Sequence, residues 1–166
     1  MNPNEFQLAQ VNVATLSAPL DSPQLKDFVD NLDRINALAE ASDGFVWRLK
    51  GDGNDATSLR PFGAEVIVNM SVWRDVAALR DYVYRSAHIE IMRRRREWFE
   101  RMKSAAFVLW WVPAGHIPTL EDAAAKLRLL DAHGPTAAAF NFGTAFAPPG
   151  EAAPGASISF DDACPA

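Results

Sequence analysis

Residues 65–73, EVIVNMSVW, alternate between two kinds of side chain. Every second position holds valine or methionine, whereas the intervening positions include the polar residues Asn69 and Ser71. A period of two in a β-branched segment predicts a strand whose two faces meet different surroundings. Residues 105–112, AAFVLWWV, are apolar at every position, which predicts a second strand that is covered on both faces.

Two further strands and two helical regions flank these stretches. Residues 7–16, QLAQVNVATL, and 45–50, FVWRLK, are predicted to be strands. Apolar side chains recur at spacings of three and four after Ser22-Pro23 and predict a helix that ends near Gly44. A second helical region is predicted from residue 75 to about residue 102. This order predicts an α+β, ferredoxin-like βαββαβ fold, in which two helices cover one face of a four-stranded antiparallel sheet.

A C-terminal helical extension is predicted from about residue 113. Thr119 has the residue type of an N-cap, and the helix is expected to reach His133, before Gly134-Pro135. Residues 1–146 are therefore interpreted as a single domain with this extension. Residues 147–166 are rich in proline, alanine and glycine and are predicted to form a flexible tail.

The second face of the predicted sheet needs a cover. Leaving Trp110 or Trp111 in water would expose a large apolar patch, which soluble monomers rarely carry. Either a second copy of the chain packs sheet against sheet, or the extension after Pro113 folds back over the sheet. A homodimer is favoured because twofold pairing is the commonest oligomeric arrangement.

Composition excludes several classes of protein. The chain has 166 residues, a net charge of −5 and one cysteine, so a disulfide within the chain and a cysteine-based metal site are excluded. The acidic balance argues against nucleic-acid binding, and Arg93–Arg96 would point in four directions on a helix. No apolar run is long enough to span a membrane. We expect a cytoplasmic protein without a metal site, and we read the polar residues 51–63 as a solvated connection.

His88 is the main candidate for chemistry. It shares a helix face with Met92, Arg95 and Phe99, at spacings of four, three and four. Ser86 could cap a renewed helix, which would place His88 in a first turn where a neutral imidazole is favoured. A neutral imidazole can act as a base. The alternative is a structural histidine that hydrogen-bonds a backbone carbonyl.

Polar and aromatic residues complete the predicted site. We predict catalytic roles for His88, Tyr82 and Asn12, as hydrogen-bond donors or base toward a small, largely apolar organic ligand between sheet and helices. The predicted ligand-binding residues are Trp47, Asn69, Ser71, Trp73, Trp98 and Phe99.

Several segments together resemble a bacterial family. They are the opening LAQVNVATL, the FVWRL strand, the stretch NMSVWRDVAALRDYVYRSAHIEIMRRRREWFERM, and LWWVPAGHIPT. They resemble the family known as domain of unknown function 3291, within the dimeric α/β-barrel proteins related to antibiotic-biosynthesis monooxygenases. The resemblance implies a ferredoxin-like dimer and brings no established activity, although cofactor-independent oxygenases share the scaffold.

The resemblance also implies an alternative with a cofactor. Haem-degrading relatives carry an asparagine on the first strand, an aromatic residue on the second helix and a haem-ligating histidine, and the matching positions are Asn12, Tyr82 and His88. Those relatives have tryptophan where Tyr82 stands, and a longer spacing to the histidine. We therefore expect no cofactor and keep haem binding through His88 as an alternative. A non-catalytic dimerising module, with side chains filling the pocket positions, is a further alternative.

Overall fold

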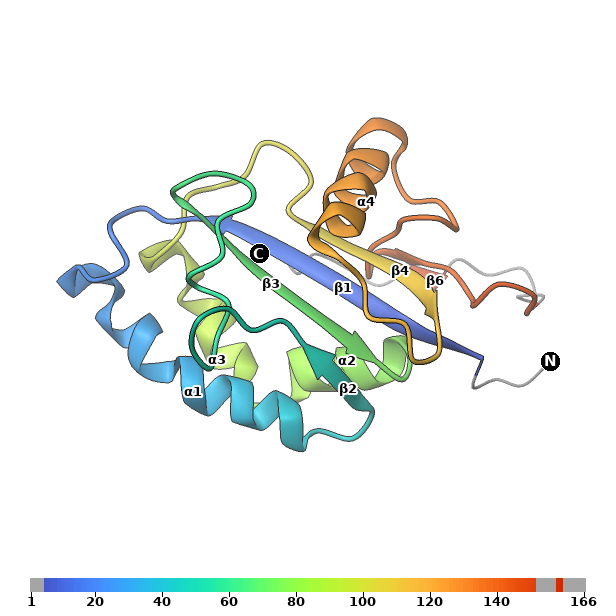
Figure 1. The fold of residues 1–166 in the computed structure, drawn as a ribbon, viewed down its shortest axis with the longest axis horizontal. Coiled ribbons are helices and arrows are strands. Elements are labelled where there is room, and N and C mark those ends of the chain that lie inside the picture. Colours follow the sequence, from blue (N-terminus) through green and yellow to red (C-terminus); the bar gives the residue numbers. More distant parts are fainter. Residues whose placement is uncertain (1–4, 152–157, 160–166) are drawn as a thin grey trace.

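The computed structural model describes residues 5–151 and 158–159, and its main sheet is antiparallel (Figure 1). The strands lie in the order β2-β3-β1-β4. Their bounds are Phe6–Thr15 for β1, Phe45–Arg48 for β2, Val66–Trp73 for β3 and Phe107–Pro113 for β4. With the intervening helices, this order confirms the predicted ferredoxin-like βαββαβ fold.

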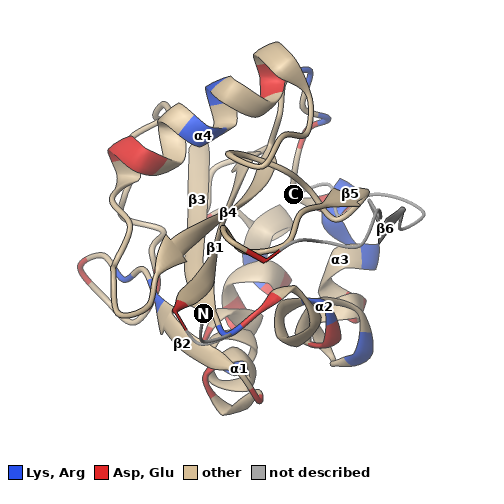
Figure 2. Cartoon of the chain, turned by 90° about the vertical axis from the view of Figure 1, so that its right-hand side faces the viewer, with Lys and Arg blue, Asp and Glu red and all other residues tan. Residues whose placement is uncertain are grey.

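Helices lie on both sides of this sheet (Figure 2). Those on one side are α1 (Lys26–Ala41), α2 (Val76–Arg85) and α3 (His88–Arg93), and on the other side lies α4 (Leu120–His133). Leu79 and Val83 of α2 pack with Trp73 in one core cluster, whereas Leu127 of α4 packs with Trp110 in another. The sheet therefore has an apolar layer against each face.

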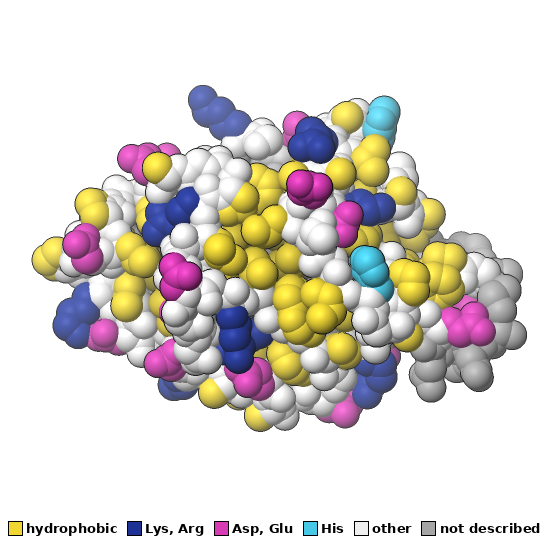
Figure 3. All heavy atoms as spheres, in the orientation of Figure 1, with side chains coloured by type: hydrophobic (Ala, Val, Ile, Leu, Met, Phe, Trp, Pro, Cys, Tyr) yellow, Lys and Arg dark blue, Asp and Glu magenta, His cyan; other side chains and the backbone are white. Residues whose placement is uncertain are grey.

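The cover on the second face comes from the chain itself. Ala123, Leu127 and Leu130 of α4 pack against this face, and only 3% of Trp110 is exposed. The extension therefore folds back over the sheet, as the second of the two predicted alternatives. Because this face is already covered, it no longer argues for a homodimer, and the homodimer stays a prediction. Apolar side chains still gather on this side of the molecule (Figure 3), and Trp47 and Phe62 are among those that are only partly buried.

The predicted helical region from residue 75 to about 102 is interrupted. α2 ends at Arg85, α3 starts at His88, and a 3-10 turn follows at Arg95–Glu97. Ser86 produces the break, because its hydroxyl donates to the Tyr82 carbonyl and accepts from the His88 backbone N–H at 3.2 Å. A helix does restart after Ser86, but Ser86 is the C-cap of α2, and the N-cap of α3 is Ala87, which makes no side-chain capping hydrogen bond.

The last described segment is a small second sheet. Strand β5 (Thr144–Ala145) pairs antiparallel with β6 (Ile158–Ser159). Residues 152–157 and 160–166 of the predicted flexible tail lie outside the described residues. Among the described helices, none combines the length and the apolar character that crossing a membrane requires.

Candidate functional site

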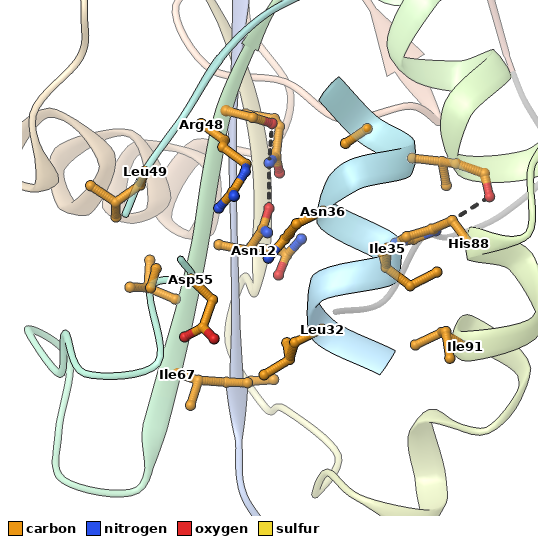
Figure 4. Close-up of a pocket in the computed structure, with 18 of the residues that line it drawn as sticks. Asn12, Leu32, Ile35, Asn36, Arg48, Leu49, Asp55, Ile67, His88 and Ile91 are labelled. Atoms are coloured by element: carbon orange, nitrogen blue, oxygen red, sulfur yellow. Dashed lines mark hydrogen bonds between the residues drawn. The ribbon is translucent and has the colours of Figure 1, made fainter. Parts of the chain in front are cut away.

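A cavity of about 170 Å³ lies between the sheet and α1, α2 and α3. Side chains of β1 and β3 form its floor, and side chains of α1, α2 and α3 line the rest of it. In Figure 4, Asn12, Asn36 and Arg48 lie near one another, while His88 and Ile91 lie on the α3 side of the cavity. The cavity is on the face of the sheet opposite to α4, which is where the sequence predicts a ligand site.

The floor is a block of polar side chains in the middle of the sheet. Strand register places Asn12 opposite Asn69 and Gln10 opposite Ser71. The Gln10 Nε2 group donates to Asn69 Oδ1 and to Ser71 Oγ, both at 2.7 Å, and the Trp73 indole N–H donates to Ser71 Oγ at 2.8 Å. Asn69, Ser71 and Trp73 all line the cavity, as predicted for ligand-binding residues.

Three amides around this cavity are not fully satisfied within the described part of the chain. Gln10 is 3% exposed, and its Oε1 atom has no hydrogen-bond partner. Asn36 of α1 is 9% exposed, and its side chain makes no hydrogen bond to a described residue. The side chain of Asn12, which is only half-buried, also makes no hydrogen bond to a described residue. Buried polar groups are normally paired, so these amides point to a polar occupant of the cavity.

His88 lines the same cavity and is half-buried. Its Nδ1 atom lies 3.4 Å from the Val83 carbonyl oxygen, which fixes Nδ1 as the protonated nitrogen in the neutral ring. Burial lowers the pKa of His88, and the Val83 carbonyl opposes that shift. The predicted neutral state is supported, although the cause is burial rather than the helix dipole. Nε2 then carries a lone pair that can accept a proton.

Tyr82 belongs to the wall of the cavity. Its ring stacks on Trp73 at 5.1 Å and lies 5.0 Å from the His88 ring. Its hydroxyl donates to the Ile35 carbonyl at 3.2 Å, and burial raises the pKa of the phenol. The predicted role of Tyr82 as a base or free donor therefore conflicts with this geometry, in which Tyr82 positions the His88 imidazole.

Arg48 is a site residue that sequence reasoning did not identify. Its guanidinium is buried, pairs with Glu40 at 2.8 Å and donates to the backbone and side-chain oxygens of Asn54. These bonds hold the connection 51–63 against the cavity, where Asp55–Thr57 line the wall and Ala56 is buried. The connection is therefore part of the site, in contrast to the predicted solvated loop.

Trp47 does not reach the cavity, which corrects a prediction. The pairing of β2 with β3 shifts between Phe45 and Trp47, so that Trp47 lies opposite Val72 and Arg48 lies opposite Ser71. This bulge reverses the expected alternation. It turns Trp47 toward the α4 face and Arg48 toward the cavity.

Comparisons with known proteins place the chain in a family. The model of the family described as a domain of unknown function, DUF3291, matches residues 7–156. The chain belongs to this DUF3291 family. No curated protein matches the sequence.

Several solved structures are similar to this DUF3291 protein at low identity. A protein of unknown function from Nitrosomonas europaea is 16% identical, with a TM-score of 0.43, and the match covers 70% of this chain and 98% of that chain. The cofactor-independent oxygenase SnoaB from Streptomyces nogalater is 18% identical, with a TM-score of 0.41 and coverage of 69% and 96%. A dabb family protein with a ferredoxin-like fold from Mesorhizobium loti is 17% identical, with a TM-score of 0.40 and coverage of 68% and 98%.

The other aromatic candidates divide between the cavity and the core of this DUF3291 protein. Phe99 lines the cavity as predicted. Trp98 is 1% exposed and packs against Phe28 at 5.5 Å, in a separate cluster with Leu16 and Leu25. Trp98 does not line the cavity, in contrast to its prediction as a ligand-binding residue, because its ring is buried in this cluster.

The cavity does not fit haem. His88 offers a nitrogen of the right type, but a space of about 170 Å³ is close to that which holds one benzene ring, far less than a tetrapyrrole needs. Among the described residues, no group of three or more His, Cys, Asp or Glu side chains could hold a metal ion.

Proposed function

We propose that this protein binds a small organic molecule, a single ring with polar substituents, in the cavity between the sheet and α1–α3. One observation carries the proposal: the buried Gln10 Oε1 atom and the side-chain amides of Asn12 and Asn36 line one cavity and have no hydrogen-bond partner among the described residues. An unpaired buried amide costs about 1–3 kcal/mol of stability, and a ligand with matching donors and acceptors offsets that cost.

The size of the cavity sets the size of the ligand. A cavity of roughly 150 Å³ with apolar walls holds benzene, and the present space is about 170 Å³. The aromatic wall of Trp73 and Tyr82 suits the flat face of a ring, while the amides suit its substituents. An open cavity also counts against the alternative module in which side chains fill the pocket positions.

Binding is tested with two probes of similar shape, benzamide and toluene. The Trp73 indole N–H resonance reports occupancy, because this group hydrogen-bonds Ser71 in the floor. Benzamide is expected to shift this resonance saturably and toluene to bind at least about tenfold more weakly. Asn12→Leu should weaken benzamide binding, whereas Arg85→Gln, an exposed change on α2 outside the cavity, should leave it unchanged. Equal binding of both probes, or of neither, would refute the proposal.

A second candidate function, cofactor-independent oxygenation, is favoured by the neutral His88. A lone pair on Nε2 can take the proton of a phenol in the cavity. The phenolate then reacts with O₂ to give a quinone: one oxygen atom becomes the new carbonyl and the other leaves as water with the phenolic and ring hydrogens. The substrate supplies all four electrons, so the step needs no further reductant.

An oxygen electrode tests this second function with resorcinol as the probe. The wild-type protein should accelerate O₂ uptake above the protein-free rate, and His88→Phe should remove the acceleration while the protein stays folded. Arg85→Gln, an exposed change on α2, serves as the control. If His88→Phe retains the wild-type rate, or if no uptake depends on the protein, the oxygenase function is excluded.

A further inference from the structure

Arg95 is a charged group of the cavity wall that has no counter-ion among the described residues. It lies in the 3-10 turn after α3 and lines the cavity together with His88, Met92 and Phe99. Its Nη1 group donates to the Met92 carbonyl at 2.8 Å. Its Nε atom is buried and has no hydrogen-bond partner within the described part of the chain.

The neighbouring acids are already engaged elsewhere. Asp27 and Glu97 both pair with Arg94, at 2.8 and 2.6 Å. Asp55 lines the cavity, but its Oδ1 atom accepts from the backbone N–H and the hydroxyl of Thr57. Among the described residues, no acid lies within ion-pair distance of Arg95. The positive charge at this end of the cavity is therefore not compensated.

The other cation of the cavity differs in this respect. Arg48 has its carboxylate partner, Glu40, and fills its remaining donors with Asn54. Arg95, by contrast, has one hydrogen bond to a backbone carbonyl and no carboxylate partner among the described residues. A guanidinium binds carboxylates and phenolates with directed hydrogen bonds.

We infer that the natural ligand is an acid, a ring bearing a carboxylate or an ionised phenol, whose negative group pairs with Arg95. The inference rests on the proposed function, because it names the class of molecule that the same cavity selects. The amides of the floor then bind the remaining polar substituents, and His88 faces the ligand from the same wall as Arg95.

The experiment compares benzoate with benzamide, two probes that differ in charge at the same position. Both are titrated at neutral pH into the wild-type protein, with the Trp73 indole resonance as the readout. Benzoate is expected to bind at least about tenfold more tightly than benzamide. Arg95→Met should abolish this preference while retaining benzamide binding, and Arg95→Lys should restore part of it. Arg96→Met, an exposed neighbour outside the cavity, removes the same charge and should leave the preference intact.

The outcomes separate this inference from the proposed function. If the wild-type protein binds benzamide and does not prefer benzoate, an acidic natural ligand is excluded, whereas the proposed binding function of the cavity stands. A preference that survives Arg95→Met also overturns the role of Arg95. If neither probe binds, the proposed function fails and the inference fails with it. If Arg95→Met does not fold, the comparison of benzoate with benzamide in the wild-type protein still decides whether the cavity prefers an acid.

Discussion

Replacing Asn36 with leucine is expected to stabilise the protein and to weaken ligand binding. Asn36 lies on the cavity side of α1, is 9% exposed and makes no side-chain hydrogen bond to a described residue. An ordinary buried asparagine is paired, and its loss destabilises the fold. Here the sign reverses, because leucine removes an unpaired amide and leaves no partner unsatisfied.

The magnitude has two contributions. Leucine is a better helix former than asparagine by about 0.4 kcal/mol. Removing the desolvation cost of the unpaired amide adds about 1 kcal/mol or more. We therefore expect the free energy of unfolding to rise by about 1–2 kcal/mol. For a domain of this size, the melting temperature should rise by about 2–8 °C.

Asn31→Leu is the matched control, because Asn31 lies on the same helix and also lines the cavity. Its amide donates to the Asp27 carbonyl at 2.7 Å and accepts from Arg34 at 3.0 Å. The helix-propensity gain is the same, but two hydrogen bonds are lost, so the control should be unchanged or destabilised. Urea unfolding and thermal melting of both variants give the comparison, and benzamide titration gives the loss of binding.

The result that refutes this reasoning is a destabilised Asn36→Leu variant. If it loses as much stability as Asn31→Leu, the Asn36 amide is satisfied in solution, and the main support for a polar ligand disappears. If it gains stability and still binds benzamide with unchanged affinity, the amide is unpaired but does not contact the ligand.

Three further predictions concern the groups around the cavity. Burial lowers the pKa of His88 below 6.5, so between the folded pKa and 6.5 the unfolded chain binds more protons than the folded chain. The free energy of unfolding should therefore fall as the pH drops through this window. His88→Gln should flatten this pH dependence, as measured by urea unfolding between about pH 5 and 7. Arg48→Met should cost about 2–4 kcal/mol, because it leaves Glu40 and Asn54 without their donor, and limited proteolysis should then cleave within residues 51–63. Ser86→Ala should lower the free energy of unfolding by about 1 kcal/mol and shift the His88 ring resonances, because it removes both hydrogen bonds of the Ser86 hydroxyl at the break between α2 and α3. Unchanged resonances would show that the break does not depend on this hydroxyl.

Alternation along the strands was sufficient to predict the floor of the cavity. Asn12, Asn69 and Ser71 fall on one face of adjacent strands at a spacing of two, and the register brings them together. Gln10 could have been found by the same rule, since it stands two residues before Asn12. Asn36 also carried a signal, as a polar residue beside the apolar stripe of α1 that includes Leu32 and Ile35.

Two other features could not be read from local pattern. The bulge that exchanges Trp47 and Arg48 depends on how β2 pairs with β3, and a one-residue slip reverses every side chain that follows. The position of residues 55–57 depends on Arg48 reaching Asn54, a contact that forms only after the strand has turned. Both features result from tertiary pairing, which local sequence patterns do not predict.

The two faces of the sheet separate stability from binding. On the α4 face, Trp110, Leu127 and their neighbours follow the rule that buried side chains are apolar, so this face supplies the core without help from a second chain. On the other face, the buried residues Gln10 and Asn36 break that rule, and the Gln10 Oε1 atom has no hydrogen-bond partner among the described residues. Local violations of this kind are expected at functional sites rather than in structural layers. The residues that break the rule all belong to one chain and line one cavity.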